Sequence, residues 1–332
     1  MEGFNYKDYL KKDGIYSVVY WSEIELLESG QGNRFYAQIL FFKNKLRESI
    51  YNSLSPPQSS ILEAVILGNQ RSMSEEVKEK LNITGLRHIT AVSGQHVVIL
   101  TGILMAFLIG LGFWRGQAFY LTIFFIFIFI AMTGFQSSGI RAGIMGGLFL
   151  LGQKLGRLSF NSRAIITAAT LMLAVNPLLL KLDVGFQLSF LAVLGIIYLM
   201  PVFLNWFRGK LSILAMTLAA QIFTLPILIY NFGNISLVAP LTNILIVPLF
   251  PFIMVLGFVS GLVGIFWQSL GQILSWPVWL LLTYLMIIVD WFSGFSWVAL
   301  SIGKVHWLWL IVAYLILGFV TWRLNKRIKF VI

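Results

Sequence analysis

The spacing of apolar residues divides the sequence into two parts. Up to His88 the apolar residues are interspersed with polar ones, whereas from Ile89 onward they run almost without interruption. A membrane-spanning helix needs about 20 predominantly apolar residues, and a surface helix shows only an apolar stripe. The pattern therefore predicts a small soluble α/β segment followed by a series of membrane spans.

Residues 1–32 are predicted to contain the end of a β-domain. Residues 15–20 and 24–27 read as two short strands. Because two strands do not form a stable sheet by themselves, we expect this region to be the C-terminal remnant of a larger domain.

Residues 33–88 are predicted to be a soluble linker of helices. An amphipathic helix is expected over 33–54 and a short apolar helix over 58–68. The segment Ser72–Glu75 has the spacing of a capping box, which predicts a charged helix that ends near Leu81.

Residues 89–332 are predicted to form an all-α polytopic membrane domain with about eight to ten spans. The segment 236–265 contains Pro240, Pro248 and Pro251, so we expect a broken or re-entrant helix there. Residues 290–300 are rich in tryptophan and are predicted to lie at the interface. The nine expected spans are 89–112, 117–134, 139–152, 164–180, 184–206, 211–230, 236–265, 269–289 and 305–322.

Composition supports a membrane protein. Of the 332 residues, 58% are apolar and 11% are charged, against about 45–50% and about 25% in soluble domains. These values exclude a soluble enzyme and a disordered chain. The absence of cysteine excludes disulfides, thiolate metal sites and cysteine nucleophiles.

The distribution of charge predicts an orientation. Residues 1–88 have eleven basic and eleven acidic side chains, so the net charge of +11 belongs to the apolar part. With nine spans, ten basic residues fall on one side of the membrane and two on the other, and basic loops stay cytoplasmic. The C-terminus is therefore predicted inside and residues 1–88 outside. Since no export signal precedes them, we expect a missing upstream membrane segment, or an even number of spans that places them inside.

Polar residues inside apolar segments are the first candidates for function, because a charge at the bilayer centre costs at least about 2.5–3.5 kcal/mol. One such stretch contains Arg87, His88, Ser93, Gly94 and His96. Ser93 and His96 are three residues apart and within reach of each other on a helix, whereas the two histidines are about 12 Å apart along the axis and do not share a metal ion. The alternatives are helix packing, a cavity lining and a catalytic Ser–His pair.

A second stretch combines small residues with a charge. Gly139, Gly143 and Gly147 form overlapping GxxxG steps, which predict a face for close helix packing. Arg141 points away from that face. Asp183 is its expected partner in a structural ion pair, and an anion-binding role for Arg141 is the alternative.

Two further polar stretches lie in the second half of the chain. Asp183 and Gln187 are four residues apart and share one helix face. Asn243 lies in the proline-containing segment 236–248. Broken helices with exposed carbonyls occur where they are buried or line a cavity, and in transporters they often mark the substrate path.

Six segments of the sequence resemble the membrane domain of the ComEC-type DNA-internalisation (competence) protein family, and they occur in family order. Gln95 and Val98 stand where the family more often has Leu and Gly. The segments are GIYSVV (14–19), ILGNQRSMSEEV (66–77), TGLRHITAVSGQHV (84–97), TGFQSSGIRAGIMGG (133–147), NPLLLKLDVGFQLSFLAVLGI (176–196) and LPILIYNFGNISLVAPLTNILIVPL (225–249).

The resemblance implies a channel component, rather than an enzyme, that takes single-stranded DNA across the bacterial cytoplasmic membrane during natural transformation. It implies that residues 1–32 end an external OB-like domain, and that an external DNA receptor, a cytoplasmic helicase motor and a separate nuclease act as partners. Membrane lipids, and a second copy of the chain in a homo-oligomer, are further partners to consider. The sequence shows no phosphate loop and no zinc signature, so we expect no cofactor and no metal. Candidate lining residues are Arg87, His88, Ser93, His96, Arg141, Gln187 and Asn243.

Two other functions remain as alternatives. A secondary transporter of an anionic small molecule or polymer is suggested by the proline-rich segment. An intramembrane serine hydrolase would use Ser93 with a histidine.

Overall fold

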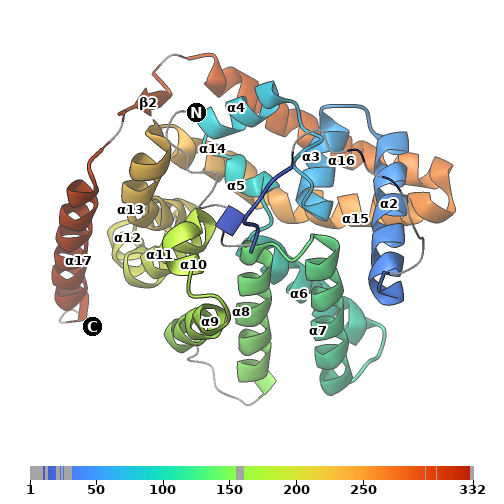
Figure 1. Cartoon of the computed structure of the whole chain (residues 1–332), viewed down its shortest axis with the longest axis horizontal. Helices are drawn as coiled ribbons and strands as arrows, with labels where there is room; N and C mark the ends of the chain where they lie inside the picture. Colours follow the sequence, from blue (N-terminus) through green and yellow to red (C-terminus); the bar gives the residue numbers. More distant parts are fainter. Residues whose placement is uncertain are drawn as a thin grey trace.

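The computed structural model shows a helical protein with a single pair of short strands among its described residues (Figure 1). It describes residues 10–11, 14–19, 23, 25, 32–154, 161–295, 297–303 and 305–329. The elements are α2 (Arg34–Ser53), α3 (Gln58–Leu67), α4 (Glu75–Ile83), α5 (Arg87–Thr90), α6 (Gly94–Gly110), α7 (Arg115–Met132), α8 (Ser137–Lys154), α9 (Asn161–Val175), α10 (Leu179–Leu182), α11 (Val184–Tyr198), α12 (Met200–Trp206), α13 (Ser212–Phe232), β1 (Asn234–Ser236), α14 (Ala239–Ile246), the 3-10 helix η1 (Val247–Leu249), α15 (Phe250–Phe266), α16 (Gln268–Ser293), β2 (Ala299–Ser301) and α17 (Trp307–Lys329).

The first helices form where the sequence predicts them. The expected helices over 33–54 and 58–68 are α2 and α3. The side chain of Asn33 caps α2, because its Oδ1 accepts hydrogen bonds from the backbone amides of Phe35 and Tyr36. The N-cap of α4 is Ser74, whose Oγ accepts from the amide of Val77 at 3.3 Å, and not Ser72. Because Val77 stands where a capping box has Glu or Gln, the predicted Ser72–Glu75 capping box does not form.

The predicted strands of the N-terminal region are covered only in part. Residues 14–19 contain no strand. Residue 20 and most of the second predicted strand, 24–27, lie outside the described residues. The interpretation of residues 1–32 as a domain remnant therefore stays a prediction.

Each of the nine predicted spans coincides with a helix, but they differ in length. Five helices among the described residues are long and apolar enough to cross a membrane: α7, α13, the continuous run α14–α15, α16 and α17. A sixth is the pair α11 and α12, which bends by 42°. The remaining three are the shorter apolar helices α6, α8 and α9. The chain is an all-α, multi-pass membrane protein.

The break in the helices lies elsewhere than the prolines of 236–265 suggest. Helices α14 and α15 are joined without a gap by η1, and the sharp bend falls between Tyr198 and Met200. The predicted interfacial piece at 290–300 is divided between the end of α16 and strand β2. That strand pairs antiparallel with β1, with Ile235 opposite Leu300.

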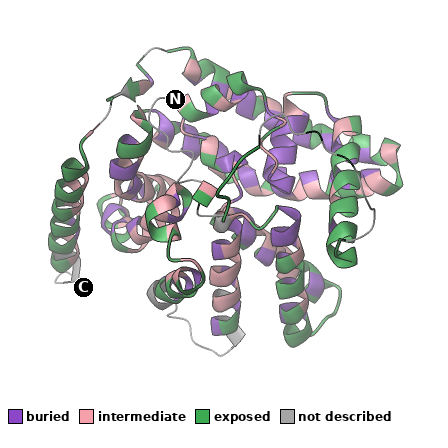
Figure 2. Cartoon of the chain, viewed as in Figure 1, coloured by how far each residue is buried: buried purple, intermediate pink, exposed green. Residues whose placement is uncertain are grey.

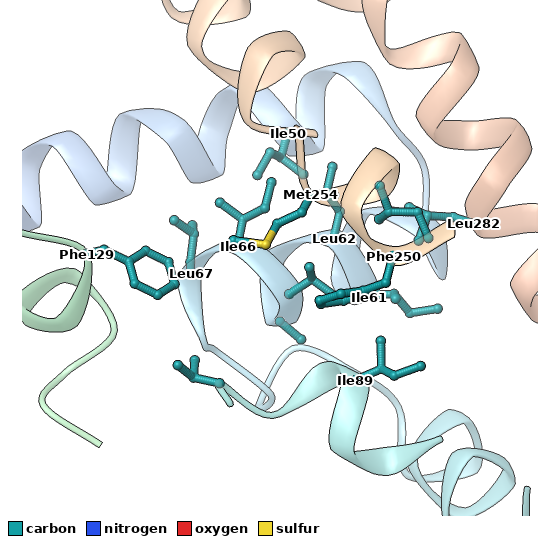
Figure 3. Packing of buried hydrophobic residues seen from close by; sticks show 14 of the residues in the cluster. Ile50, Ile61, Leu62, Ile66, Leu67, Ile89, Phe129, Phe250, Met254 and Leu282 are labelled. Atoms are coloured by element: carbon teal, nitrogen blue, oxygen red, sulfur yellow. The ribbon is translucent and has the colours of Figure 1, made fainter. Parts of the chain in front are cut away.

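The largest core is built around α3, in which residues 59–67 are all buried (Figures 2 and 3). Leu62 and Ile66 of α3 face Gly257 of α15, and Leu46 of α2 faces Gly261. The missing side chains of these glycines let the helices approach closely. The helices of 33–88 therefore share one core with α15 and α16, and their predicted status as a separate soluble linker stays untested.

Helix α17 stands apart at one side of the molecule (Figure 1). Only 6% of its span is buried. Two hydrogen bonds hold it, from Tyr314 Oη to the carbonyl of Phe223 at 3.0 Å and from Asn325 Nδ2 to the carbonyl of Tyr198 at 2.7 Å.

Candidate functional site

The short helix α5 lies near the centre of the molecule, between α4 and α6 (Figure 1). The turn before it is held on α14, because Thr242 Oγ1 donates a hydrogen bond to the carbonyl of Thr84 at 2.8 Å. Gly85 has a φ of +75° and packs so closely on Ala239 that a Cβ atom there would overlap its side chain. Only glycine combines this backbone conformation with this contact.

Arg87 is held by the loop that follows α3. Its Nη2 donates to Gln70 Oε1 at 3.0 Å, and Gln70 Nε2 donates to the carbonyl of Thr90 at 3.2 Å. Its Nη1 is buried and has no hydrogen-bond partner within the described chain. His88 is exposed and its Nδ1 lies 3.1 Å from the carbonyl of Gly85.

Ser93 and His96 are in contact at the start of α6. Nδ1 of His96 lies 3.0 Å from Ser93 Oγ and accepts a hydrogen bond from the Ser93 amide at 3.2 Å. The imidazole is fully buried against the edge of Phe250, with ring centroids 4.8 Å apart. Its Nε2 has no hydrogen-bond partner in the part of the chain that the structure describes.

The Ser93–His96 pair caps a helix. Because Nδ1 already accepts the backbone amide, and no described acidic group orients Nε2, the pair lacks the third group that holds a base in a Ser–His mechanism. This geometry gives the hydrolase alternative no support.

The start of α8 joins the same cluster. Gln136 Nε2 donates to the carbonyl of Gly68 at 3.1 Å. The position of a Cβ on Gly139 would lie 3.6 Å from Val92. The end of α3, the link between α5 and α6, and the start of α8 therefore meet around α5. We use the name α5 cluster for Gly68, Gln70, Arg87, His88, Thr90, Val92, Ser93, His96 and Gln136.

Residues of the proline-containing segment border the α5 cluster. Gln221 Nε2 donates to the carbonyl of Ser236 at 3.2 Å, and Ser236 Oγ lies next to Gly85. Asn243 is buried next to Thr242 on α14. The oxygens Gln221 Oε1, Ser236 Oγ and Asn243 Oδ1 are buried without a hydrogen-bond partner among described groups.

Arg141 faces away from the α5 cluster, toward α11. Its Nη1 donates to the carbonyl of Gly185 at 3.3 Å and its guanidinium lies 5.6 Å from the ring centre of Phe190. The Asp183 carboxylate attracts it electrostatically and also caps α11, since Oδ1 accepts from the amide of Phe186 at 3.0 Å. Arg141 and Asp183 both belong to a second polar cluster at the start of α11, and the predicted ion pair between them stays a prediction.

Gln187 belongs to this second cluster but bonds locally. Its Nε2 donates to the carbonyl of Leu180 at 2.8 Å. The side chain therefore ties α11 to the end of α10. The structure brings together four of the seven predicted lining residues (Arg87, His88, Ser93 and His96) with Asn243 at their border, while Arg141 and Gln187 lie on the far side of α8.

The packing glycines differ in part from the predicted set. Gly139 contacts Val92, and Gly143 packs tightly on Ile130. At Gly147 and Gly94 a Cβ atom would meet nothing within 4 Å. Gly146 makes a contact that was not predicted: a Cβ atom there would lie 3.2 Å from Val97 of α6. Gly94 instead begins α6.

Sequence reasoning missed Gln70, the residue that binds Arg87 from a distant position. Its signal was its place inside the segment 66–77, which matches the family pattern. No group of three or more His, Asp or Glu side chains among the described residues is arranged to hold a metal ion.

The family model described as "Competence protein" matches residues 65–327. The chain belongs to the Competence protein family. The matched region of this family contains the α5 cluster and the second polar cluster, and its start coincides with the last turn of α3.

The chain is also similar in sequence to a protein of known name. The chain is 31% identical over 261 residues to ComE operon protein 3 of Bacillus subtilis (strain 168). The aligned region covers 78% of this chain and 33% of that protein. The chain thus spans about a third of the length of this relative. No solved structure matches.

Proposed function

We propose that this chain forms part of the path by which single-stranded DNA crosses the cytoplasmic membrane during natural transformation. Membership of the Competence protein family supports this function. The observation that carries it is the α5 cluster, which gathers polar side chains from segments far apart in the sequence inside an apolar helical protein.

The unpaired polar atoms of the α5 cluster and of the residues that border it point to water. Arg87 Nη1, His96 Nε2 and the oxygens of Gln221, Ser236 and Asn243 are all buried without a partner among described groups. Buried polar groups in proteins are nearly always hydrogen-bonded, to protein or to ordered water. We infer that water or the transported strand satisfies them.

Positive charge favours a polyanion as the transported molecule. The region from residue 89 onward has thirteen basic and two acidic residues. Proteins that bind single-stranded nucleic acid without sequence preference do so with positively charged grooves. In this proposal Arg87 contacts phosphate. Arg141 and Gln187 line the neighbouring part of the path at α11, where they bond to the carbonyls of Gly185 and Leu180. His88, Ser93, His96 and Asn243 supply polar lining.

The proposal assigns no catalytic step to this chain. The force that pulls the strand, the capture of DNA outside the cell and the degradation of the second strand belong to separate proteins: a cytoplasmic helicase motor, an external receptor and a nuclease. Assembly of several copies around one path is compatible with the exposed apolar surface of the helices.

The test is uptake of labelled DNA into a nuclease-protected cytoplasmic pool. Arg87→Ala is expected to lower uptake about tenfold, the factor that corresponds to about 1.4 kcal/mol of lost stabilisation, while DNA still binds outside the cell. Arg71→Ala is the matched control, because Arg71 is exposed in the neighbouring loop and the charge change is the same. Normal uptake with stably produced Arg87→Ala protein would contradict the proposal.

A further inference from the structure

Glu63 is a fully buried acidic residue in the middle of α3. Three side chains from outside the helix satisfy it. Its Oε1 lies 3.1 Å from Arg47 Nε and accepts from Asn69 Nδ2 at 2.7 Å. Its Oε2 accepts from Tyr51 Oη at 2.8 Å. A carboxylate can accept all three hydrogen bonds, whereas an amide in its place can offer only one acceptor atom.

Asn69 organises residues 68–72, the first part of the loop between α3 and α4; we call this part the 68–72 loop. Gly68 ends α3 in the left-handed conformation, with a φ of +72°. Asn69 Oδ1 then accepts from the amide of Arg71 at 3.3 Å, and its carbonyl accepts from Ser72 Oγ at 3.3 Å. With its Nδ2 on Glu63, Asn69 uses its side chain and its carbonyl to shape the loop.

The 68–72 loop in turn holds the α5 cluster. Gln70 binds the Arg87 guanidinium at 3.0 Å and the carbonyl of Thr90 at 3.2 Å. The carbonyl of Gly68 accepts from Gln136 at the start of α8 at 3.1 Å. Hydrogen bonds therefore connect Glu63 to Asn69 and Gln70 to Arg87, and the peptide backbone joins Asn69 to its neighbour Gln70.

We propose that Glu63 is a positioning residue that acts through Asn69 to hold the 68–72 loop, and through the loop holds Arg87 in place for the passage of DNA. This inference rests on the proposed function. A buried ion pair adds little stability compared with apolar residues of the same volume, so a role in geometry accounts for a glutamate at this position better than a role in stability does.

The experiment removes the connection and leaves Glu63 in place, because substituting Glu63 would leave Arg47 without its partner and endanger folding. Asn69→Ala removes the hydrogen bond to Glu63 and the one that Asn69 Oδ1 accepts from the Arg71 amide within the loop, and it keeps the contacts of Glu63 with Arg47 and Tyr51. Thr283→Val is the matched control: it removes the acceptor of Gln58 Nε2, a side-chain hydrogen bond of 3.1 Å at the other end of α3.

Order of the loop is measured independently of DNA. Spin labels are placed on Glu48→Cys of α2 and Arg71→Cys of the loop, both exposed positions in a chain without native cysteine. The distance distribution between them is expected to be narrow in the parent and in Thr283→Val, and broad in Asn69→Ala. Uptake of labelled DNA is expected to fall about five- to tenfold in Asn69→Ala, the fall that corresponds to the loss of its hydrogen bond to the buried Glu63.

The outcomes separate the two proposals. A distribution in Asn69→Ala as narrow as in the parent would overturn the positioning role. A broad distribution with normal uptake would also overturn it, because the loop would then not matter for transport. Normal uptake in Arg87→Ala would instead refute the function of the α5 cluster, whatever the spin labels report.

Discussion

Asp183 caps a helix and carries a negative charge, and single substitutions can remove these two properties separately. Its Oδ1 caps α11 and its carboxylate attracts Arg141. Asp183→Ala is expected to lower the free energy of unfolding by about 0.5–2 kcal/mol for the cap, and by more for the buried arginine that loses a partner. Asp183→Asn is expected to recover the cap portion, because asparagine caps as well as aspartate. Thermal unfolding in detergent measures both.

The comparison also has an outcome that contradicts this account. If Asp183→Asn loses as much stability as Asp183→Ala, the cap contributes nothing and the charge acting on Arg141 accounts for the whole effect.

Lys80 gives a prediction for the dependence of stability on pH. Lys80 bonds to Glu76 of the same helix at 2.7 Å and to Asp290 at 2.9 Å, and the second contact joins α4 to the end of α16. Both contacts raise the pKa of Lys80 above its usual 10.5. A raised pKa means that the stabilisation is complete below pH 10.5 and is lost as the pH rises through the higher folded-state value. Because the pair is partly exposed, we expect about 0.2–1 kcal/mol.

Unfolding midpoints from pH 9 to pH 12, compared with Lys80→Met, check this prediction. The parent is expected to be the more stable protein at pH 9, with the difference shrinking at the upper end. A difference that stays constant over this range would show that the charge of Lys80 does not contribute.

Between elements, the contact of α11 with α13 depends on Gly195. A Cβ atom there would overlap the carbonyl oxygen of Ala219, a backbone atom that cannot rotate away. Gly195→Ala is expected to force the helices apart and to cost about 1–3 kcal/mol of unfolding free energy. Gly102→Ala is the control, since nothing lies within 4 Å of its Cβ position, and alanine there favours the helix. Equal stability of the two variants would contradict this.

The positions of the prolines explain why the sequence pattern predicted a helix break within 236–265 and missed the bend between Tyr198 and Met200. Pro240, Pro248 and Pro251 stand in the first two positions of α14, η1 and α15, where a helix does not need the missing amide. Three helix starts in succession let the run continue without a gap. Pro201 occupies the same position in α12, and there the chain bends. A proline thus marks a helix start, while the angle is set by packing that the sequence does not display.

For the whole molecule, the apolar pattern was sufficient to predict the helices, and the motifs were sufficient to predict the family. They could not assign faces. Arg141 and His96 occur in similar polar interruptions of apolar helices, yet Arg141 of α8 bonds to the carbonyl of Gly185 in α11 and His96 of α6 packs on Phe250 of α15. The bond between Gln70 and Arg87 depends on a tertiary contact across 17 residues, which no local spacing encodes.

The orientation in the membrane is a prediction for the molecule as a whole. Cysteines placed at Arg71 and Lys181 are expected to react with an impermeant maleimide on intact cells, and those at Lys210 and Lys326 only after permeabilisation. All four positions are exposed. Reaction of Arg71→Cys and Lys210→Cys from the same side would instead indicate an even number of spans.

The pairing of β1 with β2 also has a consequence for synthesis. Asn234 pairs with Ser301 and Ser236 with Ala299, so the first strand leaves the ribosome about 65 residues before its partner. At about 5–20 residues per second, its hydrogen-bonding edge waits on the order of 3–13 s. During that interval α14, α15 and α16 have to insert while one side of the α13–α14 connection is still unpaired.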